Sequence, residues 1–366
     1  MKTTTLTFGL GILSLCLAIF FLSGMERLPP QAPAAVASFA TAPTVTATSY
    51  ATALPPTATA TPTPVATATA VGPTTIPTPT PRTPGTPWRV GVQVGHLRSD
   101  ELPAELTRLR SSSGTRYGSL TEAEVNAAIV LELQKVLEAA GVVVDVLPAT
   151  VPPSYDSDAF VAIHSDGNPS AQVRGWKMAN PWRVSRAAQQ LLEAIRASYA
   201  TITRVPEDLD GITFNMRGYY AFSTRRFMHA IANTTPAVII ETGYLTNAAD
   251  RQLIVDQPQK VAQGIADGML AYLRARDPND GAALLPPNFP LMRAREAGVA
   301  VRSAPRDSAG VLLRIDPDTR FMPISAADGW YEGIVRGGGR VVGWVKQDQL
   351  ESTSEPFVLP TPSDSH

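Results

Sequence analysis

The sequence has almost no cysteine, because Cys16 is the only one in 366 residues. It lies inside an apolar N-terminal run, so no disulfide can form in the rest of the chain. Any metal site there has to be built from histidine and carboxylate side chains. Leu15 stands where a lipid-anchoring motif needs a small residue, which argues against a lipid on Cys16.

An excess of positive charge is also lacking. The 31 Lys and Arg residues balance 32 Asp and Glu residues, for a formal net charge of −1. Without a basic footprint the chain is not expected to bind nucleic acid. Histidine is scarce as well, since the chain has only four, of which His96, His164 and His229 are internal.

Charge is nearly absent from the stretch before residue 88. Arg82 is the only charged residue between positions 30 and 87, in a sequence dense in Pro, Thr and Ala. This composition cannot bury a core and is typical of an extended linker, in part polyproline-like. At about 3.1 Å per residue these 58 residues would reach about 180 Å, enough to hold a domain well away from a membrane. We therefore expect a disordered linker at 25–87.

Residues 1–24 have the features of an export segment. Lys2 supplies a positive start, and residues 6–22, "LTFGLGILSLCLAIFFL", are almost continuously apolar. This run is close to the roughly 20 residues that span a bilayer. Leu22 occupies the first position of the only cleavage-like triplet, which favours an uncleaved signal anchor over a cleaved signal peptide. Both interpretations place the bulk of the protein outside the cytoplasm, either anchored in the membrane or secreted.

Regular structure is predicted from residue 88 onward. Strands are expected in "WRVGVQVGH", "VVVDVL", "AFVAIH" and "PAVIIE", and helices in "LTEAEVNAAIVLELQKVLEAAG", "VSRAAQQLLEAIRASY" and "PQKVAQGIADGMLAYLRAR". Thr121 and Glu124 form a capping box for the first helix, Gly141 ends it, and Pro258 suits the first turn of the last. Strands that alternate with amphipathic helices predict an α/β open sheet with helices on both faces over 88–276.

Four residues with metal or proton chemistry fall near one edge of this sheet. His96, His164 and Glu241 each follow a predicted strand, and Glu122 opens a helix. Ligands of open α/β sheets bind beyond the carboxyl ends of the strands. Two imidazoles and a carboxylate are a known catalytic zinc set, and a second carboxylate can act as a general base. Each residue also has a simpler interpretation: a turn histidine, a first-turn acid that favours the helix dipole, or a structural partner of an arginine.

The motifs around these residues resemble the zinc-dependent N-acetylmuramoyl-L-alanine amidases (amidase type 3 family), which have a phosphorylase/hydrolase-like α/β fold. The match rests on Gly95-His96, "EAEVN", "AIHSDGN" and, most specifically, "PAVIIETGYLTN". The resemblance implies His96, Glu122 and His164 as zinc ligands and Glu241 as the catalytic residue. It departs from the family where Leu97 and Arg98 replace Gly-Gly, in the long 97–119 insert, and at Asp166.

A second domain is expected at 289–352, after a Pro/Gly/Asn-rich linker at 277–288 and before a disordered tail at 353–366. Strands are predicted in "GVAVRSAP", "GVLLRI", "TRFMPIS", "GWYEGIV" and "RVVGWVK", with the spacing of a small β-barrel. The segment resembles bacterial SH3-like domains, which are often cell-wall-targeting modules. Trp330, Tyr331 and Trp344 are more typical of core residues than of a binding platform.

The resemblance implies an exported zinc hydrolase that cleaves the amide between N-acetylmuramic acid and L-alanine in peptidoglycan. An alternative is a non-catalytic wall-binding or regulatory protein on a degenerate amidase scaffold, and a zinc peptidase is a third hypothesis. We expect a monomer whose partner is peptidoglycan. His229 is predicted on a short helix, "TRRFMHAI", with a surface or groove-lining role. Arg225 and Arg226 are expected on a solvated face.

Overall fold

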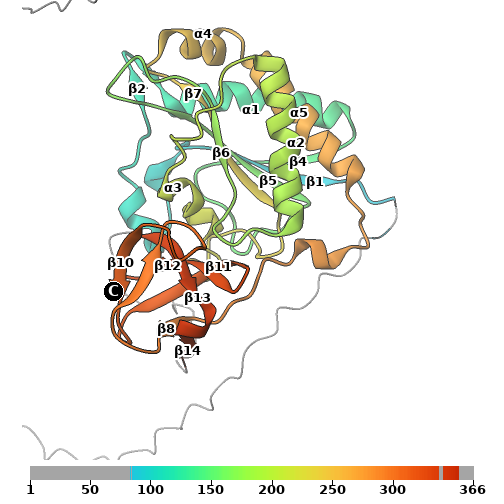
Figure 1. Ribbon diagram of the computed structural model, residues 1–366. Helices are drawn as coiled ribbons and strands as arrows, with labels where there is room; N and C mark the ends of the chain where they lie inside the picture. Colours follow the sequence, from blue (N-terminus) through green and yellow to red (C-terminus); the bar gives the residue numbers. More distant parts are fainter. Residues whose placement is uncertain (1–82, 84, 338–340, 354–366) are drawn as a thin grey trace, which may run out of the picture. The chain divides into compact units, whose positions relative to one another are not determined.

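The computed structural model describes residues 83, 85–337 and 341–353. The predictions for the export segment, for most of the linker and for the tail from residue 354 lie outside these residues. Figure 1 shows that the described chain forms a first, α/β part and a second part made mainly of strands. Among the described residues, no helix combines the length and the apolar character needed to cross a bilayer.

The first part is built on a five-stranded sheet in the order β4-β1-β5-β7-β6. Its strands are β1 (Arg89–Val94), β4 (Val143–Leu147), β5 (Ala159–Asp166), β6 (Lys177–Ala179) and β7 (Ala237–Tyr244). Strands β4, β1, β5 and β7 run parallel to one another, and β6 adds an antiparallel edge to β7. The four long strands confirm the sequence prediction, whereas β6 was not predicted.

One face of this sheet is covered by the long helices α1 (Glu122–Ala139), α2 (Arg186–Thr203) and α5 (Pro258–Ala275), of which α2 and α5 run side by side (Figure 1). Alternate strand residues, such as Val92, Val161 and Ile240, bury their side chains on this face. The short α4 (Ala248–Asp256) packs against α5 and β7. The fold is mixed α/β, but all the long helices share one face of the sheet, and only short helical elements cover the other face. The predicted helices on both faces are therefore found only in this coarser form.

The other face is covered by shorter elements. These are α3 (Phe214–Arg217) and the 3-10 turns η1 (Ser99–Glu101), η2 (Ala104–Leu109) and η3 (Tyr220–Phe222). Phe160, Ala162 and Ile239 of the strands pack there against Leu106 of the insert and Phe222. The end of the insert forms β2 (Arg116–Tyr117), which pairs as a hairpin with β3 (Leu120–Thr121) and leads into α1. The 97–119 insert is therefore part of the folded core on this face.

The helix boundaries follow their local chemistry. Thr121 accepts a hydrogen bond from the backbone N–H of Glu124, whose side chain accepts from the backbone of Thr121, which confirms the capping box of α1. Gly141 follows α1 with φ +81°, a conformation in which glycine avoids the Cβ penalty. Pro258 occupies the first turn of α5, and Ser185 caps α2 by accepting from Ala188 N–H.

The second part is a seven-stranded antiparallel sheet in the order β10-β9-β13-β12-β11-β8-β14. Its strands are β8 (Met292–Ala294), β9 (Val299–Arg302), β10 (Val311–Ile315), β11 (Arg320–Ala327), β12 (Trp330–Val335), β13 (Val342–Lys346) and β14 (Leu350–Ser352). The 3-10 turns η4 (Gly281–Leu284) and η5 (Gln347–Gln349) precede β8 and β14. All five predicted strands are confirmed, and β8 and β14 are additional. Trp330 is buried and Tyr331 and Trp344 are half-buried, while the SH3-like assignment stays a prediction.

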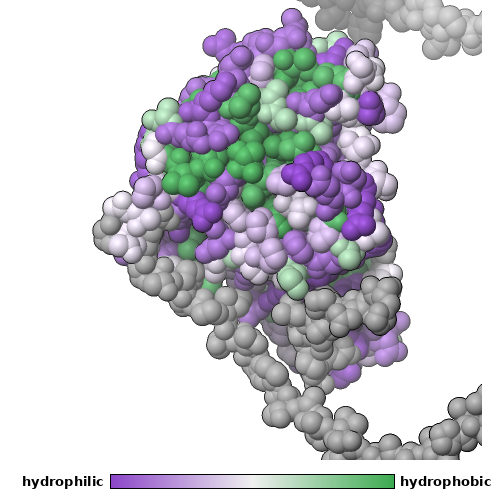
Figure 2. Space-filling view, turned by 180° about the vertical axis from the view of Figure 1, so that it is seen from behind, coloured by the Kyte–Doolittle hydropathy of each residue, from purple (hydrophilic) through white to green (hydrophobic). Residues whose placement is uncertain are grey.

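The edge strand β4 leaves apolar side chains in contact with solvent. Val143 and Val146 are 47% and 41% exposed, respectively. Nearby residues Pro152 and Tyr155 line a hollow beside the same strand. Figure 2 shows apolar side chains gathered in a patch on the rear face of the molecule.

Candidate metal centre

His164 and Glu241 lie opposite each other on adjacent strands. They are register partners in the parallel pairing of β5 with β7. Side chains alternate between the two faces of a strand, so both residues share the face of Ala162 and Ile239, away from the long helices. The sequence placed both at strand ends, but β5 continues to Asp166 and β7 to Tyr244.

The pairing register shifts immediately after His164. His164 pairs with Glu241, whereas Asp166 pairs with Tyr244, so β7 contributes one extra residue in this interval. Such bulges are common beside active sites because they redirect side chains. The hydroxyl of Thr242 donates to the His164 carbonyl over 3.1 Å and thereby ties the bulged segment to β5.

His96 reaches the same site from the end of β1 through an unusual backbone conformation. Its φ is 62°, in the left-handed region that non-glycine residues rarely adopt. The preceding Gly95 is needed for close packing, since a Cβ at this position would lie 2.5 Å from Cε1 of His164. The strained turn therefore lets β1 end directly beside β5.

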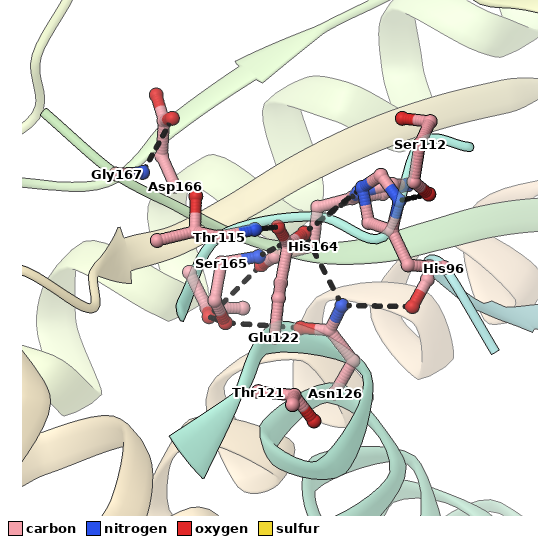
Figure 3. A network of polar contacts seen from close by, with 12 residues as sticks. His96, Ser112, Thr115, Thr121, Glu122, Asn126, His164, Ser165, Asp166 and Gly167 are labelled. Atoms are coloured by element: carbon pink, nitrogen blue, oxygen red, sulfur yellow. Dashed lines mark hydrogen bonds and ion pairs between the residues drawn. The ribbon is translucent and has the colours of Figure 1, made fainter. Parts of the chain in front are cut away.

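Glu122 joins the two histidines from the first residue of α1. Its Oε1 lies 3.0 Å from Nδ1 of His164 and 3.5 Å from Nε2 of His96. The two imidazole rings are nearly perpendicular, with centroids 5.0 Å apart. One donor atom from each of the three residues lies within 4.8 Å of the others. Figure 3 shows the three side chains pointing toward one another from separate elements.

The 97–119 insert supplies polar contacts to two of these residues. The Ser112 carbonyl lies 2.7 Å from Nδ1 of His96, and the Thr115 N–H donates to Oε2 of Glu122 over 2.8 Å (Figure 3). Gly114, with φ +72°, makes the approach possible because a Cβ there would lie 2.6 Å from Oε2 of Glu122. Sequence reasoning missed these residues, since both contacts use backbone atoms that leave no side-chain signal.

Asn126 and Ser165 complete the surroundings of Glu122. Asn126, one turn further along α1, donates to the Gly95 carbonyl over 3.2 Å and accepts from the hydroxyl of Ser165 over 3.0 Å. The Ser165 backbone N–H donates to Oε1 of Glu122 over 3.2 Å. Asn126 is the last residue of the "EAEVN" run. Because it lies one helical turn after Glu122, the sequence could have indicated that the two side chains are neighbours.

The electrostatics of the three residues reflect their burial and their proximity. Burial alone would raise the pKa of Glu122, but the hydrogen bond from His164 and the charges of both imidazoles outweigh it and lower that pKa. Burial lowers the pKa of His96 more than Glu122 raises it. For His164 the order reverses, because Glu122 and Glu241 overcome the effect of burial and raise its pKa. Glu122 therefore stays ionised between the two rings.

Glu241 lies beside this cluster with an unused oxygen. In the part of the chain that the structure describes, its Oε2 is buried and has no hydrogen-bond partner. Burial raises the pKa of Glu241, and the charge of His164 is the main effect that opposes it. Glu122 and Asp166 raise this pKa further, and Lys177 lowers it. A carboxylate with a raised pKa and a free acceptor oxygen is suited to exchange protons.

Lys177 is a charged neighbour of Glu241 that the sequence did not reveal. It pairs with Glu241 in the antiparallel register of β6 with β7 and is buried. Its ammonium forms an ion pair with Asp166 and donates to the Tyr244 hydroxyl over 2.6 Å, and that hydroxyl donates to Asp208 over 2.6 Å. Asp166, one of the departures from the family pattern, thus has a basic partner at this edge of the sheet.

The remaining predicted residues lie away from the cluster. His229 is half-buried, and its Nδ1 lies 2.8 Å from Oε1 of Glu105 in the insert. The predicted helix around His229 is wrong, since residues 224–230 form turns and bends. Arg225 is half-buried and donates to Asn288 over 2.7 Å, and Arg226 is exposed, as expected for a solvated face.

The donor set fits a divalent transition metal. Two imidazole nitrogens and one carboxylate oxygen are the ligand types of catalytic zinc sites. Metal-bound histidines usually donate their second ring N–H to a carbonyl, and the Ser112 carbonyl occupies that position for His96. The Nε2 atom of His96 is then left with its lone pair directed toward Glu122.

Comparison with known proteins agrees with the motifs. Residues 90–271 match the family Amidase_3, described as N-acetylmuramoyl-L-alanine amidase. A protein named "Probable cell wall amidase LytH" from Staphylococcus aureus is 30% identical over 175 residues, 45% of this chain and 54% of that relative. The chain therefore spans about half the length of the curated relatives it matches.

Two solved amidase structures are also similar. N-acetylmuramoyl-L-alanine amidase AmiC2 of Nostoc punctiforme is 20% identical and covers 51% of this chain and 97% of its own, with a TM-score of 0.37. Ami1 from Mycobacterium smegmatis is 18% identical, covers 52% of this chain and 98% of its own, and has a TM-score of 0.39.

Proposed function

We propose that residues 90–271, which match the N-acetylmuramoyl-L-alanine amidases, form the catalytic domain of a zinc-dependent amide hydrolase. Its substrate would be the bond between N-acetylmuramic acid and L-alanine in peptidoglycan. One observation carries the proposal: donor atoms of His96, Glu122 and His164 lie within 4.8 Å of one another, beside Glu241. The family match supplies the substrate class.

His96, Glu122 and His164 would hold the metal. When bound there, zinc supplies Lewis-acid polarisation of a carbonyl and the means to deprotonate water at neutral pH. The ionised state of Glu122, favoured by its lowered pKa, keeps a negative charge available to the cation. The Ser112 carbonyl and the Thr115 N–H hold two of the three side chains in place.

Glu241 would act as general base and then as general acid. Its free Oε2 can accept a proton from the attacking water and return it to the departing amine of L-alanine. A raised pKa suits both steps, because a base is most effective when its pKa lies near the working pH. Lys177 holds a positive charge close to Glu241 and limits the rise of that pKa.

The other parts of the chain fit an extracytoplasmic enzyme of the cell envelope. The apolar residues 6–22 would export the protein and, if they are not cleaved, anchor it in the membrane. The antiparallel sheet of residues 292–352 would serve as an SH3-like module that tethers the enzyme to the wall and raises the local substrate concentration.

Two measurements on the purified protein test this proposal. Digestion of purified peptidoglycan should release new L-alanine amino termini while the glycan strands stay intact. Metal analysis should find one zinc per chain, and changing His96, Glu122 or His164 to Ala should each cause its loss. Unchanged zinc content in a variant would remove that residue from the ligand set. Full zinc with no new amino termini would favour a non-catalytic scaffold.

A further inference from the structure

The second ring nitrogen of His164 faces a tyrosine. While Nδ1 lies against Glu122, Nε2 lies 3.4 Å from the Tyr219 hydroxyl oxygen. The Tyr219 ring also packs edge-on against the imidazole, with centroids 5.5 Å apart and an interplanar angle of 83°. Tyr219 precedes the turn η3 and is half-buried. The direction of the hydrogen bond between the two decides which ring nitrogen of His164 has a free lone pair.

A buried glutamine sets that direction. Gln93 on β1 is completely buried, and its Nε2 donates to the Ala149 carbonyl over 2.9 Å and to the Tyr220 hydroxyl over 2.7 Å. A carbonyl can only accept, so the amide nitrogen rather than the amide oxygen has to face Ala149. The orientation of the Gln93 amide is therefore determined, and its Oε1 points the other way, to the Tyr219 hydroxyl at 2.9 Å.

The remaining directions follow from the number of protons. Oε1 of Gln93 can only accept, and Tyr219 donates its single hydroxyl proton to it over 2.9 Å. The Tyr220 hydroxyl is a second possible acceptor beside Tyr219, and donation to either atom uses the same proton. What Tyr219 presents to His164 is then a lone pair, and Nε2 of His164 has to be the donor. When Nε2 keeps its hydrogen, Nδ1 is the only ring nitrogen that can offer a lone pair to a metal, and Nδ1 is the atom that lies against Glu122.

We propose that Tyr219 and Gln93 are positioning residues that hold His164 with Nε2 as hydrogen-bond donor and Nδ1 as metal ligand. This inference rests on the proposed function, because it assigns a role toward the metal. Tyr219 and the Ser112 carbonyl play equivalent roles for His164 and His96, respectively. Each accepts a hydrogen bond from the ring nitrogen that faces away from Glu122. The two histidines thus use different ring atoms, Nε2 of His96 and Nδ1 of His164.

Zinc affinity of the full chain is the direct test. Tyr219→Phe keeps the ring that packs on His164 and removes the hydroxyl, which is both the acceptor for His164 and the donor to Gln93. Loss of such an outer partner typically weakens metal binding about 10–100-fold. We expect a loss in that range by competition with a chelator, together with loss of the slowly exchanging Nε2 proton of zinc-loaded His164. With four histidines in the chain, that resonance can be assigned from ¹⁵N-histidine labelling.

Tyr220→Phe is the matched control. Tyr220 also contacts Gln93, but on the donor side of the amide, where the Ala149 carbonyl still fixes the orientation. Its zinc affinity should stay within about twofold of wild type. Gln93→Met is a second test of the same hydrogen-bond chain, because it removes the atom that accepts the Tyr219 hydroxyl proton. The double variant should bind zinc no more weakly than Tyr219→Phe alone, since both changes act on one chain of hydrogen bonds.

Other outcomes would overturn the assignment. The assignment is wrong if the zinc affinity of Tyr219→Phe stays within about twofold of wild type. It is also wrong if Tyr220→Phe loses as much zinc affinity as Tyr219→Phe, because that result would indicate an effect of packing. A raised KM with unchanged zinc affinity would make Tyr219 a substrate contact instead. If wild type itself binds no zinc, the proposed function fails first, and the two failures are thus distinguishable.

Discussion

Strand pairing determines the position of Glu241, and an unpartnered carboxylate oxygen determines its chemistry. Pairing with His164 fixes its backbone beside the proposed metal ligands, and Oε2 has no hydrogen-bond partner within the described residues. Glu241→Gln should therefore keep the zinc and the fold but lose turnover about 10²–10⁴-fold, the usual contribution of a general acid–base group. The loss should appear in kcat rather than KM. Zinc content, melting temperature and turnover of one preparation check this.

The opposite result would identify a structural glutamate. In that case Glu241→Gln would lower the melting temperature while the folded fraction kept near-normal specific activity. Near-normal turnover with full zinc would contradict the role of general base.

The charges around Glu241 predict two opposite shifts in pH dependence. Glu241 has to be deprotonated to act as a base, so its raised pKa moves the acidic limb of kcat/KM above the pH expected for an ordinary glutamate. Lys177 lowers that pKa and Asp166 raises it. Lys177→Met should therefore move the acidic limb to higher pH, and Asp166→Asn should move it to lower pH. The measurement is kcat/KM against pH at saturating zinc, with metal content checked at each point.

A shift of both variants in one direction would show that the limb belongs to another group. Loss of the ion pair between Lys177 and Asp166 is common to both variants, so it cannot by itself produce shifts of opposite sign.

Sequence reasoning found the side chains that the structure brings together and missed the residues that hold them in place. His96, Glu122, His164 and Glu241 lie at element boundaries or in recognisable motifs, so their meeting could be predicted. The contacts of Ser112 and Thr115 use backbone atoms, and Gln93 looks like any alternate residue of a strand. Such partners become visible only when the tertiary contacts are known.

Among the elements, the insert has the clearest functional consequence. Gly114 and Gly118 both have positive φ, +72° and +61°, but only a Cβ at Gly114 would meet other atoms, namely Oε2 of Glu122 and ring atoms of His96. Gly114→Ala should therefore weaken zinc binding, whereas Gly118→Ala should only lower stability. Zinc competition and thermal unfolding of the two variants separate the two effects. Equal zinc affinities would show that the insert can shift without disturbing the ligands.

The long elements could be predicted because their patterns are strong, and the errors have local causes. The strand β6 has only three residues, too few for a periodic signal. The predicted helix at "TRRFMHAI" fails because the backbone N–H groups of Met228 and His229 donate to the Glu105 carboxylate instead of to carbonyls four residues earlier. The partner, 123 and 124 positions away, is beyond any local pattern.

For the whole molecule, the presence of two separate large sheets could be predicted from the linker and from the change in strand spacing. The linker predicted at 277–288 is not entirely irregular, because Ala283 and Leu284 of η4 are buried in the core of the first part. Whether the second sheet is a wall-targeting module depends on its surface chemistry, which strand spacing does not determine.

Removal of the second sheet should distinguish tethering from catalysis. A chain lacking residues 289–352 should lose more activity on intact walls than on small soluble muropeptides, because a tether changes the concentration of enzyme at a surface and not the chemical step. Rates on both substrates, at equal zinc content, provide the measurement. An equal loss on both would indicate that the sheet supports the fold of the first part.

The donor atoms of the proposed zinc site come from segments far apart in the chain, with Glu122 and His164 separated by 42 positions. They meet only after β1, α1 and β5 have docked, so an unfolded chain has no comparable affinity for zinc. A ligand that binds only the native state stabilises it by about 2.7 kcal/mol at 100 times its Kd. The zinc level of the compartment in which the chain folds would then determine how much of it escapes proteolysis, so that metal supply controls abundance as well as turnover.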